Sequence, residues 1–270
     1  MMVPRLMARS LRQGVAGSLA LLIGLFIFEL IVPPVANDVG TTQLDPVLQS
    51  LPPAVQALTR SSPDLVIGSG IQGYLSVGFT SPVFLLMICA GIVSFTSGLA
   101  GEIERGSIQL ALSRSVSRLS VYGARLAGSV VLAIAFSVVG PLGVLTGLGL
   151  IDTAETINRT ALIPTGVAMF ALLWSVAGVT MLLAAVGQRG GQVVGWSISW
   201  LVVSYFVDYF ATLWSALEPF TPLSIFNYFA PTRTLIQASY TMDNLVTLGA
   251  IGLVGAMLGA VVFARRDLPS

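Results

Sequence analysis

The sequence predicts an all-α protein that crosses a membrane six times. Of its 270 residues, 55% are hydrophobic and 9% are charged, whereas about 25% of the residues in an average soluble domain are charged. The chain also contains apolar runs long enough to cross about 30 Å of hydrocarbon as helices of roughly 20 residues. These runs lie at residues 15–32, 73–100, 120–150, 161–187, 193–216 and 244–264.

The composition excludes several kinds of active site. The chain has no Lys, and therefore neither a Walker A phosphate loop nor a Schiff-base lysine. With no His and a single cysteine, Cys89, the usual zinc sites, His-based triads and disulfides within the chain are excluded. The net charge of +1 gives no field that would attract nucleic acid. We therefore expect no cofactor or metal in this chain.

The N-terminal residues 1–14 are expected to form a short interfacial helix before the first span. Arg5, Arg9 and Arg12 share one helical face by their spacing. A cleaved signal peptide is the alternative, but Glu29 inside the first apolar run and five later spans argue against it. Glu29 lies near the outer end of its span, where hydration or contact with the outer loop is the simplest interpretation.

The second and third apolar runs are longer than a membrane needs, so we expect them to tilt or to continue as helix into water. The third contains Gly140-Pro141 and could kink there. An outer loop at 33–72 shows helical spacing of apolar residues and is expected to carry short amphipathic helices. The last outer segment, 217–243, is rich in aromatic residues and Pro, which favours the outer edge of the membrane.

The distribution of arginine predicts the orientation of the chain. Six spans place both termini on the same side. Only Arg60, Arg159 and Arg233 fall on the opposite side, and the other ten of the 13 basic residues lie with the termini. By the positive-inside rule, both termini are expected in the cytoplasm.

The only substantial loop on that side covers residues 101–118. Its acids, Glu102 and Glu104, come first, and Arg114 and Arg118 follow. That order suits a helix macrodipole with acids near its positive end, so a cytoplasmic helix is expected here. A solvated loop that simply obeys topology rules is the alternative.

This loop resembles the corresponding loop in the permease subunits of ABC transporters of the type-2 exporter class. Ser115 stands where that family usually has Pro, and Arg125 where it often has Lys. The order and spacing of further matches extend the resemblance over nearly the whole chain. The matching stretches are Gly101-Glu102-x-Glu104-Arg105-Gly106-Ser107, Ser113-Arg114-Ser115-Val116-Ser117-Arg118, Leu51-Pro52, Gly73-Tyr74, Pro222-x3-Phe226 and Phe263-x2-Arg266-Asp267.

The resemblance implies a permease half in a prokaryotic plasma membrane. It would pair with an identical or similar permease chain and bind separate cytoplasmic ATPase subunits, which would hold ATP and Mg. Residues 101–118 would be a coupling helix that docks into an ATPase cleft, and residues 1–14 an elbow helix. The docking residues so implied are Glu102, Glu104, Arg105, Gly106, Ser107, Ser113, Arg114 and Arg118. A secondary transporter or channel without an ATPase, and a scaffold that transports nothing, are the alternatives.

The fifth span carries a polar stripe, because five residues spaced 7, 4, 4 and 3 apart share one helical face. An ionisable group within a span usually faces protein or water. The stripe is therefore a candidate substrate path or dimer cleft. A polar helix–helix contact, or hydration of the acid near the outer interface, is an equally good interpretation. The five residues are Ser197, Ser204, Asp208, Thr212 and Ser215.

Overall fold

The computed structural model describes residues 3–39, 50, 52, 70–106, 117–152 and 157–266. Among these residues there are helices and turns but no strand, which confirms the predicted all-α class. Within the described ranges, six helical stretches are long and apolar enough to cross a membrane, as predicted. The α-helices are α1 (Val3–Val39), α5 (Gly70–Thr80), α6 (Pro82–Glu104), α8 (Arg118–Leu148), α9 (Leu162–Val186), α10 (Gly190–Ala211), α11 (Pro231–Gln237) and α12 (Met242–Arg265), and the 3-10 helices are η1 (Arg159–Ala161), η2 (Ser215–Leu223) and η3 (Ile225–Tyr228).

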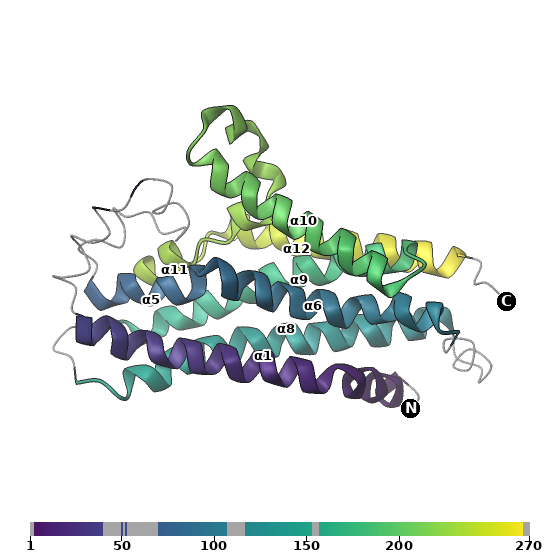
Figure 1. Cartoon of the computed structure of the whole chain (residues 1–270), viewed down its shortest axis with the longest axis horizontal. Coiled ribbons are helices and arrows are strands. Elements are labelled where there is room, and N and C mark those ends of the chain that lie inside the picture. The colour runs from purple at the N-terminus through teal and green to yellow at the C-terminus, as the bar shows by residue number, and fades with distance from the viewer. Residues whose placement is uncertain are drawn as a thin grey trace.

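The long helices run side by side in one elongated bundle (Figure 1). Helix α1 packs along α8, α9 packs along α12, and α6 lies against both α9 and α10. Close approach of α9 and α12 depends on glycine: a Cβ added to Gly255 would lie 2.7 Å from the carbonyl carbon of Gly178. Small residues at such contacts let two helix backbones touch, which is how helices associate in a membrane.

The start of α1 and the end of α12 lie at one end of the bundle, together with the end of α6 and the start of α8 (Figure 1). We call this end the termini side. It has its own small hydrophobic cluster, separate from the larger one that fills the rest of the bundle. The small cluster contains Leu99, Ala100, Ile103, Val121, Tyr122, Met181, Ala184, Ala185, Val193 and Phe263.

The first helix differs from its predicted boundaries at both ends. Residues 3–14, expected as a separate elbow, belong to the same continuous helix as the span, and the helix runs through Pro33 and Pro34 to Val39. The outer loop therefore begins after residue 39 rather than at 33. Packing explains the tolerance of proline: α8 presents Gly147 here, where an added Cβ would lie 2.9 Å from the Pro33 ring. A neighbouring helix can hold a transmembrane helix together across proline.

The second apolar run is broken, where one continuous helix was expected. Helix α5 ends at Thr80 and α6 begins at Pro82. Proline has no N–H to donate to the carbonyl of Gly78, and that carbonyl instead accepts from the Ser81 N–H at 3.3 Å. In contrast, α8 continues as one helix past Pro141.

The aromatic and Pro-rich segment at 217–243 includes η3 and α11, and α11 packs against α5. The Gln72 side chain donates to the Leu235 carbonyl at 2.5 Å, and Thr232 donates to Ser76 at 3.1 Å. Helix α11 therefore packs at the end of the bundle opposite the termini side (Figure 1). Its depth in a membrane stays a prediction.

Candidate functional site: the charged network on the termini side

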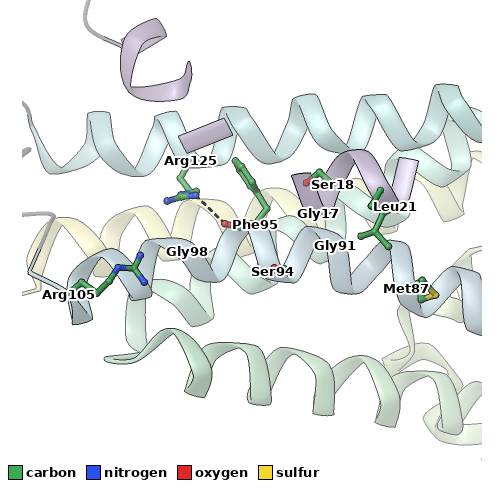
Figure 2. A pocket seen from close by; sticks show the side chains of 11 residues that line it. Gly17, Ser18, Leu21, Met87, Gly91, Ser94, Phe95, Gly98, Arg105 and Arg125 are labelled. Atoms are coloured by element: carbon green, nitrogen blue, oxygen red, sulfur yellow. Dashed lines mark hydrogen bonds between the residues drawn. The ribbon is translucent and has the colours of Figure 1, made fainter. Parts of the chain in front are cut away.

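Arg125 is the most deeply buried basic residue among the described residues, at 4% exposure. It lies on α8, about two turns after the start of the helix. Its side chain reaches toward α6. Together with Arg105 it lines one end of a pocket of about 570 Å³ between α1 and α6 (Figure 2). Gly98 makes room for it, since a Cβ there would lie 3.0 Å from a terminal guanidinium nitrogen.

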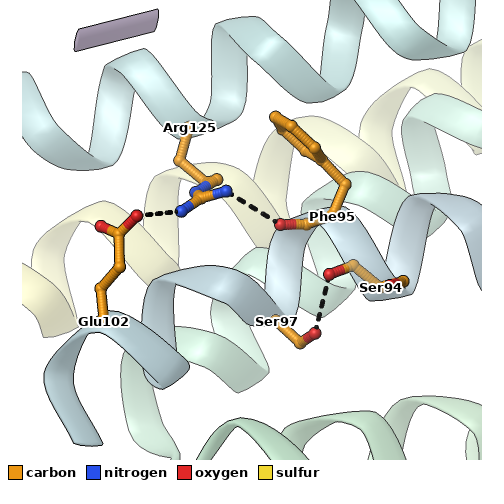
Figure 3. Close-up of polar contacts among 5 residues, drawn as sticks. All are labelled: Ser94, Phe95, Ser97, Glu102 and Arg125. Atoms are coloured by element: carbon orange, nitrogen blue, oxygen red, sulfur yellow. Dashed lines mark hydrogen bonds and ion pairs between the residues drawn. The ribbon is translucent and has the colours of Figure 1, made fainter. Parts of the chain in front are cut away.

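The guanidinium of Arg125 joins α8 to α6 through two acceptors (Figure 3). It donates to the Glu102 carboxylate at 2.5 Å and to the Phe95 carbonyl at 3.3 Å. Its central carbon also lies 5.1 Å from the centre of the Phe95 ring. Because the Arg125 side chain is 5% exposed and that of Glu102 22%, this ion pair is far less screened than a surface pair.

Glu104 makes a second link, from α6 to α10. Its carboxylate accepts from the backbone N–H of Gly190 at 2.9 Å. Gly190 is the first residue of α10, and the preceding Arg189 makes no side-chain capping bond. Glu104 therefore caps the positive N-terminus of α10 from a different helix.

A third link joins α8, α9 and the C-terminal end of α12. Arg266 donates to the carbonyls of Ala185 and Gly187 at 2.9 and 2.8 Å, and its own carbonyl accepts from Arg118. A cation at the last carbonyls of a helix stabilises that helix end. We call Glu102, Glu104, Arg118, Arg125 and Arg266 the charged network, which ties together five helices around the small hydrophobic cluster.

Glu102 and Glu104 do not begin a cytoplasmic helix, contrary to the prediction, because they lie at the end of α6. Glu102 and Glu104 belong to the last turn of α6, near its negative end. Arg125 and the α10 N-terminus offset that unfavourable position. Arg105 and Gly106 form the turn that follows, and Gly106 has a φ of +68°, which favours glycine.

Of the remaining docking candidates, Arg118 starts α8 within the network. Ser107, Ser113 and Arg114 lie outside the described residues. Sequence reasoning missed Arg125 and Arg266 as members of this site. The signal for Arg125 was available, since it is an arginine seven residues beyond Arg118 inside an apolar span.

The polar stripe of the fifth span divides into an inner and an outer part. Ser197 is fully buried, with no hydrogen-bond partner for its hydroxyl among the described residues. Ser204 is also buried, and its hydroxyl accepts from the Ile225 N–H at 3.1 Å. Asp208 is half-buried, whereas Thr212 and Ser215 are exposed. The helix ends at Ala211, so Ser215 belongs to η2 and not to the predicted face.

Glu29 lies in the bundle and not at a hydrated interface, contrary to the interpretation above. It is 1% exposed, and one carboxylate oxygen is buried with no hydrogen-bond partner among the described residues. It packs against Gly78 of α5, where an added Cβ would lie 2.9 Å from the Glu29 carboxyl carbon.

Six apolar helices in one bundle, closed at one end by a charged network, define a multi-pass membrane protein. Residues 6–264 match the family model described as "Multidrug efflux system permease Rv1217c, C-terminal domain". The chain belongs to this family of permeases. The comparison with curated proteins finds no significant match.

Proposed function

We propose that this chain is the membrane-spanning permease half of an ATP-driven exporter in a prokaryotic plasma membrane. Two permease chains, identical or similar, would pair and bind two cytoplasmic ATPase subunits, which hold ATP and Mg. Membership of a multidrug efflux permease family supports export of a range of compounds. The apolar interior favours amphipathic molecules as substrates.

The charged network supports the proposal that the ATPase is coupled to movement of the permease helices. The connection between α6 and α8 starts beside Glu102 and Glu104 and ends at Arg118, and each of these side chains contacts another helix or the C-terminal segment. A displacement of that connection by an ATPase would therefore move α6, α8 and α10 together. Transport requires that the ATPase subunits bind ATP more favourably when the permeases are in one arrangement than in the other.

A route for substrate is proposed along the outer part of the polar stripe. Asp208 is half-buried near the end of α10, and Thr212 and Ser215 are exposed beyond it. Ser197 and Ser204 pack inside the chain and contribute to helix contacts. A second permease chain facing this part of α10 would place the cleft between the two copies.

ATPase docking is tested best at a charge outside the network. Reversing Glu102 would set two arginines against each other and damage the fold, so Arg114→Glu is the better variant. It should weaken capture of the ATPase about 30-fold, if reversal of a docking charge costs about 2 kcal/mol. ATPase copurification and ATP-dependent efflux in inverted vesicles are the measurements.

Arg265→Glu is the matched control, because Arg265 is exposed at the termini side and lies at the end of α12. It should leave ATPase capture and efflux unchanged. Equal capture and equal efflux in both variants would contradict docking through residues 101–118. Efflux that proceeds without ATP and follows an ion gradient would identify a secondary transporter, and absence of any flux a scaffold.

A further inference from the structure

The pocket between α1 and α6 is a groove with a polarity gradient along its length. Arg105 and Arg125 lie at one end, and Met87 lies toward the other (Figure 2). At about 1.5 Å per helical residue, the 18 positions from Met87 to Arg105 correspond to about 27 Å. Ser18 and Ser94 lie between, and Leu21 lines the apolar part. The groove is therefore cationic at the termini side and apolar deeper in the bundle.

The lining of this groove is positively charged, although Arg125 also pairs with Glu102 outside the lining. Two arginines line it, and none of the described lining residues is acidic. A guanidinium carries five N–H groups. Arg125 donates two of them, one to Glu102 and one to the Phe95 carbonyl. Arg105 is exposed and repels Arg125. An anion between the two guanidinium groups would relieve that repulsion and accept charge-assisted hydrogen bonds.

The surface beside the groove is apolar and exposed. Met87 is 44% exposed, and Leu19 and Ile23 on the neighbouring face of α1 are 49% and 58% exposed. Both helices belong to the candidate membrane spans. The mouth of the groove therefore opens at the depth of the lipid chains and not into water.

We propose that the groove binds an anionic phospholipid from the membrane leaflet on the termini side. The phosphate group lies between Arg105 and Arg125, and one acyl chain lies along Leu21 and Met87. The second chain stays in the bilayer, since a cavity of about 570 Å³ accommodates only part of the molecule. The site shares Arg125 with the charged network. Lipid binding nevertheless does not require the proposed ATP coupling, and it involves this chain alone.

Two variants separate the headgroup contact from the apolar groove. Arg105→Gln removes a cation without touching the Glu102–Arg125 pair. Gly17→Phe fills the groove, because Gly17 lines it and no heavy atom lies within 4 Å of an added Cβ. The matched controls are Arg265→Gln, which removes an exposed arginine from the same end, and Gly24→Phe, at another open position of α1 that does not line the groove.

The experiment measures binding of phosphatidylglycerol and phosphatidylcholine, each with one fluorescent chain, to the purified full chain in zwitterionic micelles. Phosphatidylglycerol should bind more tightly. Both test variants should weaken its binding about tenfold, as expected for loss of a charge-assisted hydrogen bond or of an apolar chain site. Both control variants should bind like the parent protein.

A milder variant keeps the test decisive if Gly17→Phe does not fold. In Gly17→Cys, phosphatidylglycerol should protect the new thiol from a hydrophobic maleimide and phosphatidylcholine should not. The native Cys89 is fully buried, so labelling of the parent protein gives the background. Equal binding or equal protection by the two lipids overturns the proposal. Loss of a dimer in Gly17→Phe, with lipid binding unchanged, overturns it in favour of a second copy as the occupant.

Discussion

Arg125 shows what an ionisable residue requires when a helix carries it into an apolar bundle. It has one carboxylate partner, one carbonyl acceptor and the face of an aromatic ring. An ion pair of this kind does not guarantee net stability, because desolvation opposes the attraction. Loss of either partner, however, removes the attraction that offsets the desolvation of the other charge.

Arg125→Leu should lower the free energy of unfolding by about 3 kcal/mol. This value lies at the lower end for a buried pair, because Glu102 is 22% exposed and can recover some hydration. The double variant Arg125→Leu/Glu102→Leu should be more stable than Arg125→Leu alone. A double-mutant cycle from thermal unfolding in detergent measures the coupling. If the two single effects simply add, the pair contributes no interaction energy.

At this scale, the sequence predicted which residues gather on the termini side but not which of them touch. Glu102 and Glu104 were expected at the positive end of a helix and lie at the negative end of α6. Their partners, Arg125 and the Gly190 N–H, are 23 and 86 positions away. Helical spacing reports neighbours within one helix only. The interpretation of Glu29 as a hydrated residue was wrong for a related reason. The position of a residue along a span gives its depth but not the neighbour that its side chain faces.

At the scale of the elements, glycine decides how closely the helices pair. Gly255 of α12 faces the backbone of Gly178 and Val179 in α9. A backbone cannot move aside as a flexible side chain can, so even one methyl group would separate the helices. Gly249, on the same helix, has no heavy atom within 4 Å of an added Cβ.

Gly255→Ala should therefore destabilise the protein by about 1–3 kcal/mol, as overpacking does. Gly249→Ala is the comparison on the same helix and should be neutral or stabilising, because alanine is the better helix former. Thermal unfolding of both variants in the same detergent gives the difference. An unfolding temperature for Gly255→Ala equal to or above that of Gly249→Ala would show that α9 and α12 can separate without cost.

Proline accounts for the errors in the predicted boundaries at the end of α1 and before α6. The six spans followed from apolar length alone and are confirmed. The effect of each proline could not be predicted from the sequence. Pro33, Pro34 and Pro141 lie within helices, whereas Pro82 starts one. Whether proline breaks a helix depends on the neighbour that packs against it, such as Gly147 beside Pro33. A single sequence does not reveal that neighbour.

At the scale of the molecule, the even number of spans agrees with the start of α1 and the end of α12 lying at one end of the bundle (Figure 1). The arginine distribution adds the prediction that this end faces the cytoplasm. Ser117, at the start of α8, and Ser215, at the start of η2, are both exposed and lie on opposite sides of this predicted topology.

Cysteine labelling tests the orientation directly. In intact cells, a membrane-impermeant maleimide should label Ser215→Cys, and should label Ser117→Cys only after the membrane is opened. Cys89 is fully buried and contributes little signal. Labelling of Ser117→Cys in intact cells would place the charged network outside and remove the basis for an ATPase partner there.

The break at Pro82 also bears on the order in which the chain is assembled during synthesis. Helix α6 is long and apolar enough to enter a membrane by itself, without α5. The hydrogen bonds of α5 to α11 join Gln72 to Leu235 and Ser76 to Thr232, which are 163 and 156 positions apart. These bonds cannot form until the ribosome has passed residue 237. This packing of α5 against α11 therefore forms only after the first five spans have been synthesised.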